Sequence, residues 1–552
     1  MSTIPVPTSL ELLIGSLTVA ELTCTKDGRT VLIMKLEIRS VTKSMEKMSD
    51  ARWGRSPRGK RRPKPRSHRM FEVGEATFLQ ARGQAAGRRA LGRGYYCRSL
   101  LKGQTEMKRR KFLELTGMAG MALVCEPLHA GAPKEYGWPL PKFPDANPKW
   151  KRTWDAALTT LSGNVKLLST YNRPVLIEGA EYRGVWLECA PMESLVYAKL
   201  AEFVPHVEGK PSPAEIARAN HMAFFALQHG DGQLPAYIWM QEVGYGQIQM
   251  VVPVAATAWE LVKLTGDEPL LKTTYAACSR WDAWLRQYRN TRKTGLVEGF
   301  CTYDTGMDNS PRWAGIPNSC PDNDARKCPP VPSLPRLCPD LSATVYGGRI
   351  TLAAMAQALG RKKEADQWLE DAETIRQLII QKLYCAEDAA FYDLDAQGKF
   401  VRVRSDLISR VMGEHVLKLE VTSDRQIFDQ VWTRQLHNPN AFWAPFPLTS
   451  VAMNDPLYVR SIPPNSWGGA TQALTALRAT RWMEYYGKQQ EFNHLMQQWV
   501  EGINQSGKTA GEFWAQMNPM TGEFTRKGAE KGYSPTALVY LDFVRRLQSN
   551  PT

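Results

Sequence analysis

Apolar residues recur at three- and four-residue spacing through most of the chain after about residue 150. This spacing places them on one face of a helix and predicts amphipathic α-helices. The clearest stretches are residues 213–229, 252–267, 268–290, 342–360 and 362–384. Several end at Gly, Asp or Pro signals, such as the TGDEP segment at residues 265–269. Strand-like alternation is scarce, so we expect roughly twelve helices, paired through loops, in one domain over residues 145–550.

The loops between these helices are rich in Trp, Tyr, Asp, Asn and Gly. Examples are YRGVWLECAPME at residues 182–193, YDTGMDNSPRW at 303–313 and PPNSWGG at 463–469. Loops carry function more often than the elements they connect. Aromatic rings stack on sugar rings, and nearby carboxylates and amides bond hydroxyl groups, so this mixture favours a carbohydrate ligand. The alternative for each aromatic residue is packing beneath its loop.

Positive charge is concentrated in the first fifth of the chain. The net charge is +15, and residues 1–106 hold 21 Lys and Arg against 9 Asp and Glu. A basic chain of this kind invites an RNA-binding interpretation, above all for the run at residues 51–69. The rest of the chain is close to neutral, however, and such a run is typical of a solvated, disordered segment. We therefore predict no nucleic-acid partner.

Residues 107–132 have the pattern of an export signal: a basic start at Met107, an apolar stretch over 112–125 and small residues afterwards. Arg109 and Arg110 resemble the twin-arginine signal. The apolar stretch is too short to span a bilayer stably, so we expect no membrane span after signal removal. We predict that residues 1–106 are a disordered or mis-called extension and that the mature protein is periplasmic or secreted, in a bacterium. The alternative for 107–132 is an amphipathic core helix.

Seven cysteines follow this segment, and export would place them where disulfides form. Cys320, Cys328 and Cys338 lie in a proline-rich stretch without CxxC spacing or His partners, which favours a disulfide-stapled loop over zinc. Residues 322–324 (Asp-Asn-Asp) offer oxygen ligands for calcium, but a solvated turn is the favoured interpretation. No HExxH motif occurs. We therefore expect no metal and no cofactor.

Cleavage of a glycosidic bond needs two carboxyl groups, one to protonate the leaving group and one to activate water or attack carbon. The candidates are Asp308, in the 303–313 loop, and Glu512, in GEFWAQMNPMTGE at residues 511–523. Asp304 is the rival of Asp308. Glu523 is the rival of Glu512, although a residue of the turn after Pro519 more often caps or solvates the next segment.

The segment GMDNSPRW at residues 306–313 resembles the acid motif of the family 63 glycoside hydrolases, which include mannosylglycerate hydrolase-like enzymes, and its aspartate is Asp308. GVWLE at 184–188 is similar to their Trp-Asp substrate segment, with Glu188 in place of the aspartate. QMVVP at 249–253 is similar to their Gln-Pro-Pro turn. NSWGGATQALTALRAT is similar to their tryptophan-bearing loop and helix. GEFWAQMNPMTGE resembles the segment that supplies the general base, which implies Glu512.

The resemblance, which covers roughly residues 150–547, implies an all-α fold, the (α/α)6 barrel of six-hairpin glycosidases, and inversion at the anomeric carbon. Asp308 would then be the general acid and Glu512 the general base, with carboxyl groups about 6.5–9.5 Å apart. The implied substrate contacts are Trp186, Glu188, Gln249, Arg312, Trp313 and Trp467.

We expect the substrate to be an oligosaccharide or small glycoside with an α-linked glucose or mannose. Trehalose is an alternative substrate, because family 37 trehalases share this organisation. A toroid that binds glycans without cleaving them is the alternative of another class. The sequence gives no prediction of the oligomeric state.

Overall fold

The computed structural model describes residues 18–24, 30–35 and 148–549, except 180–181, 204–207, 461–465, 507–511 and 526–531. The expected signal at 107–132 and most of the extension at 1–106 lie outside these residues. Inside the extension, β1 (Thr18–Cys24) and β2 (Thr30–Lys35) pair as an antiparallel hairpin, which the sequence analysis did not predict. All other described elements belong to a separate compact unit.

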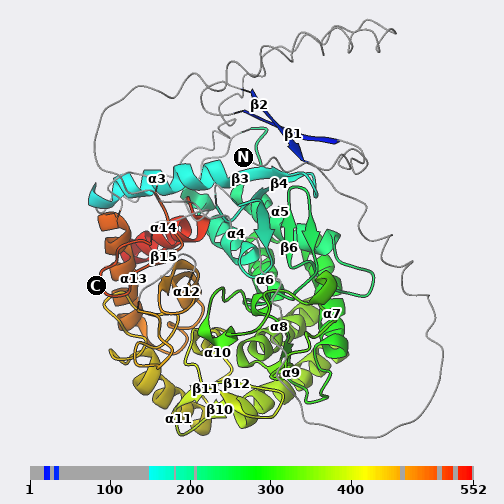
Figure 1. Ribbon diagram of the computed structural model, residues 1–552, viewed down its shortest axis with the longest axis vertical. Helices are drawn as coiled ribbons and strands as arrows, with labels where there is room; N and C mark the ends of the chain where they lie inside the picture. Colours follow the sequence, from blue (N-terminus) through cyan, green and yellow to red (C-terminus); the bar gives the residue numbers. More distant parts are fainter. Residues whose placement is uncertain are drawn as a thin grey trace, which may run out of the picture. The chain divides into compact units, whose positions relative to one another are not determined.

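Twelve α-helices occur in the described part of this unit, in agreement with the expected number (Figure 1). Five of them, α5 to α9, confirm the five stretches singled out by hydrophobic spacing. The helices are α3 (Pro148–Asn164), α4 (Ala190–Lys199), α5 (Pro213–Ala226), α6 (Val254–Thr265), α7 (Glu268–Tyr288), α8 (Pro339–Ala358), α9 (Lys362–Leu383), α10 (Leu407–Gly413), α11 (Thr422–Val431), α12 (Ala473–Ala479), α13 (Gln489–Ser506) and α14 (Ser534–Ser549).

Local capping explains where several helices begin and end. Ser212 and Glu215 form a capping box at the start of α5, in which the side chain of each residue accepts a hydrogen bond from the backbone N–H of the other. Gly266 ends α6 in the left-handed conformation, with φ of 71°. Asp267 then accepts a hydrogen bond from the backbone N–H of Leu270 (2.8 Å) and caps α7. The TGDEP segment is therefore the predicted helix boundary.

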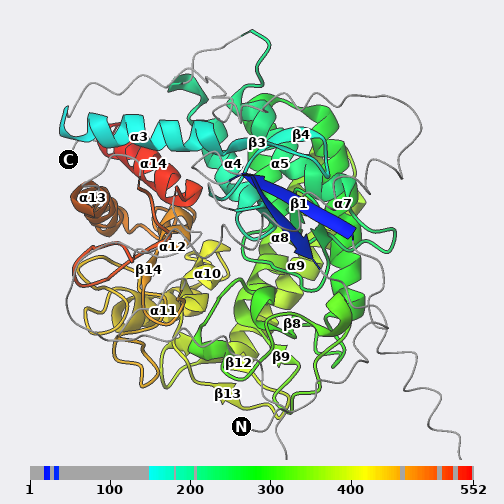
Figure 2. The same ribbon diagram turned by 45° about the horizontal axis from the view of Figure 1, so that its top comes forward.

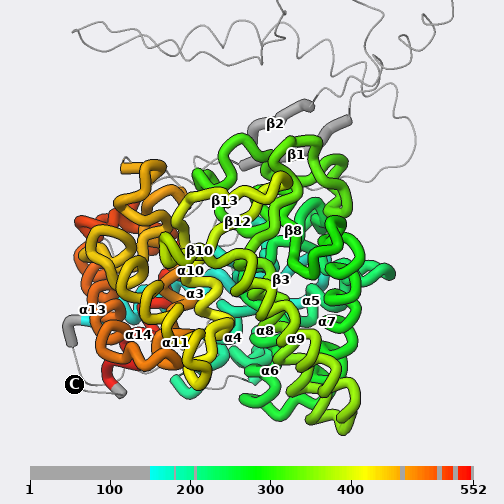
Figure 3. Tube along the Cα trace, turned by 90° about the horizontal axis from the view of Figure 1, so that it is seen from below, coloured from blue at the N-terminus to red at the C-terminus, as the bar shows by residue number. Residues whose placement is uncertain are grey.

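Six of the helices form a closed ring. Helices α4, α6, α8, α10, α12 and α14 contact one another in this order, and α14 also contacts α4. Among the remaining helices, α5, α7, α9 and α13 pack on ring helices that are their neighbours in sequence, as α5 does on α4 and α9 on α8, whereas α3 packs on α14. Figure 2 shows α3 alongside α14, although they are far apart in sequence, and Figure 3 shows α8 beside α9. The first and last helices of the helical unit thus meet where the ring closes.

Short antiparallel strands join the loops at the helix ends. One sheet contains β5 (Gly184–Trp186), β6 (Tyr237–Trp239) and β7 (Val243–Gly244), and another has the order β13-β12-β9-β8. The members of the second sheet are β8 (Glu298–Gly299), β9 (Arg336–Leu337), β12 (Asp393–Leu394) and β13 (Phe400–Val401). The two-stranded pairs are β3 (Val165–Leu168) with β4 (Arg173–Leu176), β10 (Tyr384–Cys385) with β11 (Ala390–Phe391), and β14 (Thr471–Gln472) with β15 (Gln516–Met517).

Most of the core is one continuous cluster of buried apolar side chains that extends through the helical unit, and Phe300, Cys301 and Cys320 form a second, small cluster. Its largest fully buried members include Trp154, Trp284, Trp482 and Trp499. None of the helices in the described residues is long and apolar enough to cross a membrane.

Candidate active site

A cavity of about 240 Å³ lies among the aromatic loops of the helical unit. Its described lining is made of aromatic rings, carboxyl groups and side-chain amides, with one glycine and one leucine. The lining residues are Glu178, Tyr182, Trp186, Glu188, Trp239, Gln249, Tyr303, Gly306, Asp308, Trp467, Gln472, Leu474 and Tyr533. A concave site with aromatic walls and a few convergent polar groups is the usual form of a small-molecule site.

One wall of the cavity consists of packed aromatic rings. The ring of Trp186 lies edge-on to Tyr182 (centroids 5.3 Å apart) and to Trp239 (5.8 Å). Tyr533 adjoins Tyr182 from the start of α14, with centroids 6.0 Å apart. Trp186 and Trp239 are held by the pairing of β5 with β6. These half-exposed rings offer flat apolar faces to a ligand.

Asp308 lies at the cavity on a tight turn. Gly306 and Asn309 on either side of it have positive φ angles of 58° and 56°. The backbone carbonyl of Asp308 accepts a hydrogen bond from the N–H of Trp467 (3.0 Å), so the turn is tied to the 463–469 loop. The Asp308 side chain is half-buried, as a proton donor needs to be if a ligand is to reach it.

Two further carboxyl groups share the cavity. Burial raises the pKa of Glu188 to about 8, aided by the neighbouring charges of Glu178 and Asp308. One carboxylate oxygen of Glu188 is buried without a hydrogen-bond partner. Burial also raises the pKa of Glu178 to about 8, although the hydroxyl of Tyr533 donates a hydrogen bond to it (2.7 Å). Both groups therefore retain their protons near neutral pH.

Gly306 is required by this arrangement. A Cβ atom at this position would lie 1.4 Å from Oε2 of Glu188. The positive φ angle adds a second reason, because side chains other than Gly rarely adopt it. The glycine of the GMDNSPRW segment thus lets Glu188 lie directly against the Asp308 turn.

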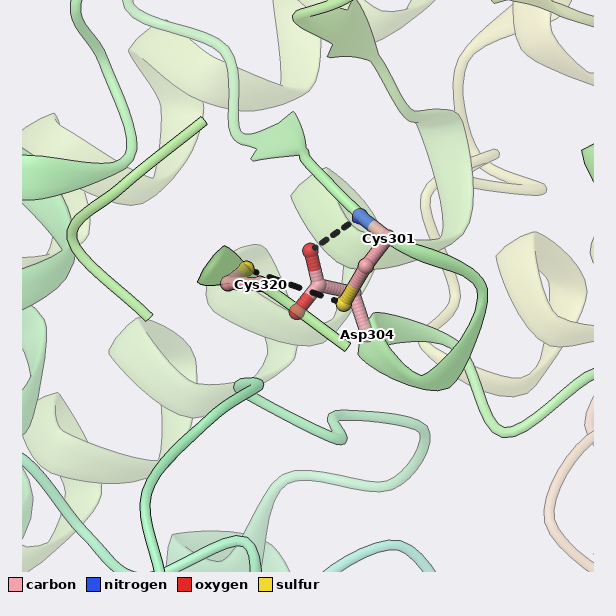
Figure 4. Close-up of side chains that lie close together, drawn as sticks. All are labelled: Cys301, Asp304 and Cys320. Atoms are coloured by element: carbon pink, nitrogen blue, oxygen red, sulfur yellow. Dashed lines mark hydrogen bonds between the residues drawn. The ribbon is translucent and has the colours of Figure 1, made fainter. Parts of the chain in front are cut away.

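Asp304, the rival of Asp308, has a structural role. It is fully buried and pairs through both carboxylate oxygens with the guanidinium of Arg289. It also accepts hydrogen bonds from the backbone N–H groups of Ile248 (2.9 Å), Phe300 (2.7 Å) and Cys301 (3.2 Å), and Figure 4 shows the bond from Cys301. With all these partners it anchors the loop that carries Asp308.

The predicted disulfide-stapled loop is not formed, because the seven cysteines that the structure describes in the helical unit are all free thiols. Cys320 lies beside Cys301 instead of Cys328 or Cys338, and the two sulfur atoms are 3.8 Å apart (Figure 4). Backbone hydrogen bonds hold the loop, among them Cys320 N–H to the carbonyl of Gly246 (2.9 Å).

The turn at residues 322–324 has its carboxylates engaged by cations. Asp322 pairs with Lys327 (2.7 Å), and Asp324 pairs with Arg326 (2.8 Å). The first pair is largely exposed, as expected for a solvated turn, whereas the side chain of Asp324 in the second pair is 18% exposed.

Arg312 and Trp313 do not line the cavity. The guanidinium of Arg312 is buried between Asp340 and Asp393, with four N···O distances of 2.7 to 2.8 Å. The buried indole of Trp313 donates a hydrogen bond to the hydroxyl of Thr305 (2.8 Å). Their placement favours a structural role over the direct substrate contact expected from the sequence. The motif at residues 306–313 did not indicate the structural role of Arg312, because its partners Asp340 and Asp393 come from segments far away in the sequence.

The other predicted contacts, Trp186, Glu188, Gln249 and Trp467, all line the cavity. Gln249 has a positive φ of 43° and accepts a hydrogen bond from the side chain of Gln247 (3.1 Å). Two guanidinium groups lie over the ring of Trp467, those of Arg410 (5.1 Å from its centroid) and Arg478 (5.6 Å). These contacts fix the Trp467 ring at the cavity wall.

Glu512 is half-buried and is not among the residues that line the described cavity. Its segment is nevertheless attached there through two of the residues that follow it. The carbonyl of the next residue, Phe513, accepts a hydrogen bond from the N–H of Tyr533 (3.0 Å). The side chain of Gln516 accepts one from Gln472 (3.0 Å). Tyr533 and Gln472 are both lining residues, so Glu512 is held close to the site by its neighbours.

The cavity also contains residues that sequence reasoning missed: Glu178, Tyr182, Trp239, Tyr303, Gln472 and Tyr533. Tyr182 and Tyr303 belong to the aromatic loops and could have been found by that signal. Glu178 and Tyr533 are 355 residues apart, and no local pattern links them.

Residues 207–535 match the sequence model of the mannosylglycerate hydrolase MGH1-like glycoside hydrolase domain. This match covers more than half of the chain. The chain therefore belongs to this family of glycoside hydrolases, as its motifs indicated. Curated protein sequences give no match.

Solved structures support the same fold. An uncharacterized conserved protein from Thermus thermophilus is 18% identical, with a TM-score of 0.53, over 72% of this chain and 99% of its own. The family 63 mannosylglycerate hydrolase from Thermus thermophilus, in complex with Tris, is 16% identical with a TM-score of 0.53, over 71% of this chain and 99% of its own. Neutral trehalase from Saccharomyces cerevisiae is 13% identical with a TM-score of 0.52, over 68% of this chain and 75% of its own.

Proposed function

We propose that this protein is an exported, inverting glycoside hydrolase that cleaves an α-linked glucoside or mannoside. Its scaffold would be an (α/α)6 barrel, with the ring of α4, α6, α8, α10, α12 and α14 as the inner layer. The observation that carries the proposal is the half-buried carboxyl of Asp308 at a small cavity with aromatic walls.

In this mechanism Asp308 donates a proton to the glycosidic oxygen, and the bond from that oxygen to the anomeric carbon breaks. A water molecule attacks from the opposite ring face and gives its proton to Glu512. Trp186 and Trp467 provide ring faces for the sugar. Glu188, which retains its proton near neutral pH, donates a hydrogen bond to a sugar oxygen.

The positions of Asp308 and Glu512 support their proposed roles as acid and base over those of their rivals. Asp308 lines the cavity, whereas Asp304 is saturated by Arg289 and backbone donors. Glu512 directly precedes Phe513, whose carbonyl binds the backbone of a lining residue. Its rival Glu523 is exposed in the turn after β15. The family membership supports hydrolysis over binding alone.

Sugar release from a panel of α-glucosides, α-mannosides, mannosylglycerate and trehalose would test the proposal. The parent should hydrolyse at least one α-linked member. Asp308→Asn and Glu512→Gln should each lower kcat by more than about 100-fold, the lower bound for loss of an acid or base. Asp366→Asn and Glu523→Gln are matched controls, because both side chains are exposed.

Three outcomes separate the alternatives. Trehalose as the single hydrolysed member would favour trehalase. Tight binding of a glycan without release of sugar would favour a non-catalytic toroid. Full activity of Asp308→Asn, with unchanged folding, would remove the proposed acid.

Export is tested independently of activity. A tagged chain that begins at Met107 should appear in the periplasm or medium, and replacement of Arg109 and Arg110 by Lys should retain it in the cytoplasm. Equal export of both proteins would contradict a twin-arginine signal.

A further inference from the structure

Four groups of three acidic or thiol side chains have their potential ligand atoms within 4.8 Å of one another in the described part of the chain. Three of these groups already contain a guanidinium partner. Arg289 pairs with Asp304 in the first, Arg312 with Asp340 and Asp393 in the second, and Arg402 with Glu387 and Asp388 in the third. The fourth group is different.

This fourth group, the Glu–Cys–Glu cluster, consists of Glu178, Cys189 and Glu193. Their exposed fractions are 5%, 1% and 0%. No Lys or Arg among the described residues forms an ion pair with any of the three. Three groups that can each become an anion are therefore enclosed together without a cation from the protein.

The chain holds the three donors on rigid elements. Cys189 directly precedes α4, and Glu193 lies one turn later, where its N–H binds the carbonyl of Cys189 (2.9 Å). Side chains four residues apart face the same side of a helix, so the sulfur and the carboxylate converge. Glu178 follows β4 and is fixed by the hydroxyl of Tyr533 (2.7 Å) and by the N–H of Ser534, which binds its carbonyl (2.7 Å).

Glu193 supplies a second, independent indication of a ligand. Its side chain is completely buried, and neither carboxylate oxygen has a hydrogen-bond partner outside the cluster among the described residues. Burial raises its pKa to about 8, and the thiol of Cys189, a member of the same cluster, lowers it. A buried carboxylate without a donor costs several kcal/mol unless a proton or a cation neutralises it.

We propose that Glu178, Cys189 and Glu193 bind a divalent transition metal ion of the zinc class. One thiolate and two carboxylates provide three ligands, which is the usual protein contribution to an open zinc site. Zinc accepts sulfur at about 2.3 Å and carboxylate oxygen at about 2.0–2.2 Å, so donors within 4.8 Å of one another need only a small contraction. Thiolate ligation disfavours calcium and magnesium, which prefer oxygen donors.

The cluster also has an entry path. Glu178 lines the 240 Å³ cavity, so an ion can arrive from that side and its fourth position can face the cavity. The ligands must lose their protons when the metal binds. Affinity should consequently fall as pH is lowered through the range in which Glu178 and Glu193 take up protons. The other titratable groups that face the cluster are Glu188, Asp308 and Tyr533.

The test uses the full chain after removal of metal with a chelator. Titration with Co²⁺ should give a near-ultraviolet thiolate-to-cobalt charge-transfer band, and reloading with Zn²⁺ should give one ion per chain by mass spectrometry. Cys189→Ser should abolish the band. Glu193→Gln should weaken binding by at least about 10-fold.

The matched control is Cys278→Ala, which removes another buried thiol that has no carboxylate in a ligand group with it. It should retain the band and the affinity. Circular dichroism establishes which variants fold, and Glu193→Gln preserves the shape of the side chain if Cys189→Ser does not fold. Absence of Co²⁺ and Zn²⁺ binding to the parent, or equal binding by Glu193→Gln, would overturn the proposal and show that protons neutralise the cluster. Neither result depends on glycosidase activity.

Discussion

Arg312 provides the sharpest distinction between a structural residue and a substrate contact. Its side chain is 1% exposed and forms bidentate ion pairs with Asp340 and Asp393, which are 2% and 0% exposed. Arg312→Met would leave the buried carboxylate of Asp393 without its cation and that of Asp340 with Arg410 alone, whose guanidinium nitrogen is 3.7 Å away. Removal of one partner from a buried pair typically costs about 3–5 kcal/mol. We therefore expect the free energy of unfolding at pH 7 to fall by about that amount.

Urea unfolding followed by far-ultraviolet circular dichroism measures this change. Arg402→Met is the matched control, because Arg402 is 51% exposed in its pairs with Glu387 and Asp388. Exposed pairs contribute about 0–1 kcal/mol, so the control should unfold almost as the parent does.

The pH dependence adds a second check on the same variant. Burial by itself raises the pKa of Asp340, but the charge of Arg312 and its hydrogen bonds outweigh this effect and hold the pKa below its ordinary value of 3.8. In the parent, the resulting stability is present above about pH 4 and is lost as pH falls through the lowered pKa. Without Arg312 the carboxyl of Asp340 takes up a proton more readily, so the variant's deficit should shrink towards pH 4. A deficit no larger than that of Arg402→Met, together with a raised KM, would refute the structural role.

Three further predictions concern the cavity and the cluster behind it. Glu193 has a raised pKa of about 8, so its protonated form stabilises the native state fully below about pH 4.5, and this stability is lost as pH rises through 8. The thermal unfolding midpoint, measured with a chelator present, should therefore decline over this pH range, and Glu193→Gln should make the decline less steep. An unchanged slope in the variant would contradict the assignment. Gly306→Ala should lower kcat/KM by about 100-fold, because the new methyl group displaces the carboxylate of Glu188. Gly315→Ala is the control: Gly315 also has a positive φ but lies in open space, so its substitution should leave kcat/KM unchanged. Trp186→Ala should raise KM by about 10-fold through loss of a stacking face, while Trp259→Ala, a half-buried tryptophan of α6 outside the cavity, should not.

Local sequence rules predicted the helices because each boundary depends on neighbouring residues. The spacing in residues 252–290 and the TGDEP signal were sufficient to separate α6 from α7. The same rules did not predict β5, β6 or the other short strands, which depend on pairing between loops far apart in sequence. Strands of two to four residues contain too few alternating positions to be seen without their partners.

The site was predictable in part. The sequence predicted that the 303–313 loop belongs to the site, and Asp308 of this loop lines the cavity. The choice between the loop's two aspartates depends on Arg289, which reaches Asp304 from the end of α7. Arg312 looked like a substrate contact because its partners, Asp340 and Asp393, are 28 and 81 residues away. The sequence around Glu178 gave no indication that it lines the cavity, because its contact with Tyr533 forms only when the ring closes at α14.

The stereochemistry of the first product tests the central claim most directly. With the best α-linked substrate from the panel, proton NMR during the first minutes of reaction identifies the anomer released before mutarotation. An inverting enzyme with Asp308 as acid predicts the β-anomer, and no product from Asp308→Asn. Release of the α-anomer would indicate retention, and would contradict the assignment of Asp308 and Glu512 to opposite faces of the sugar.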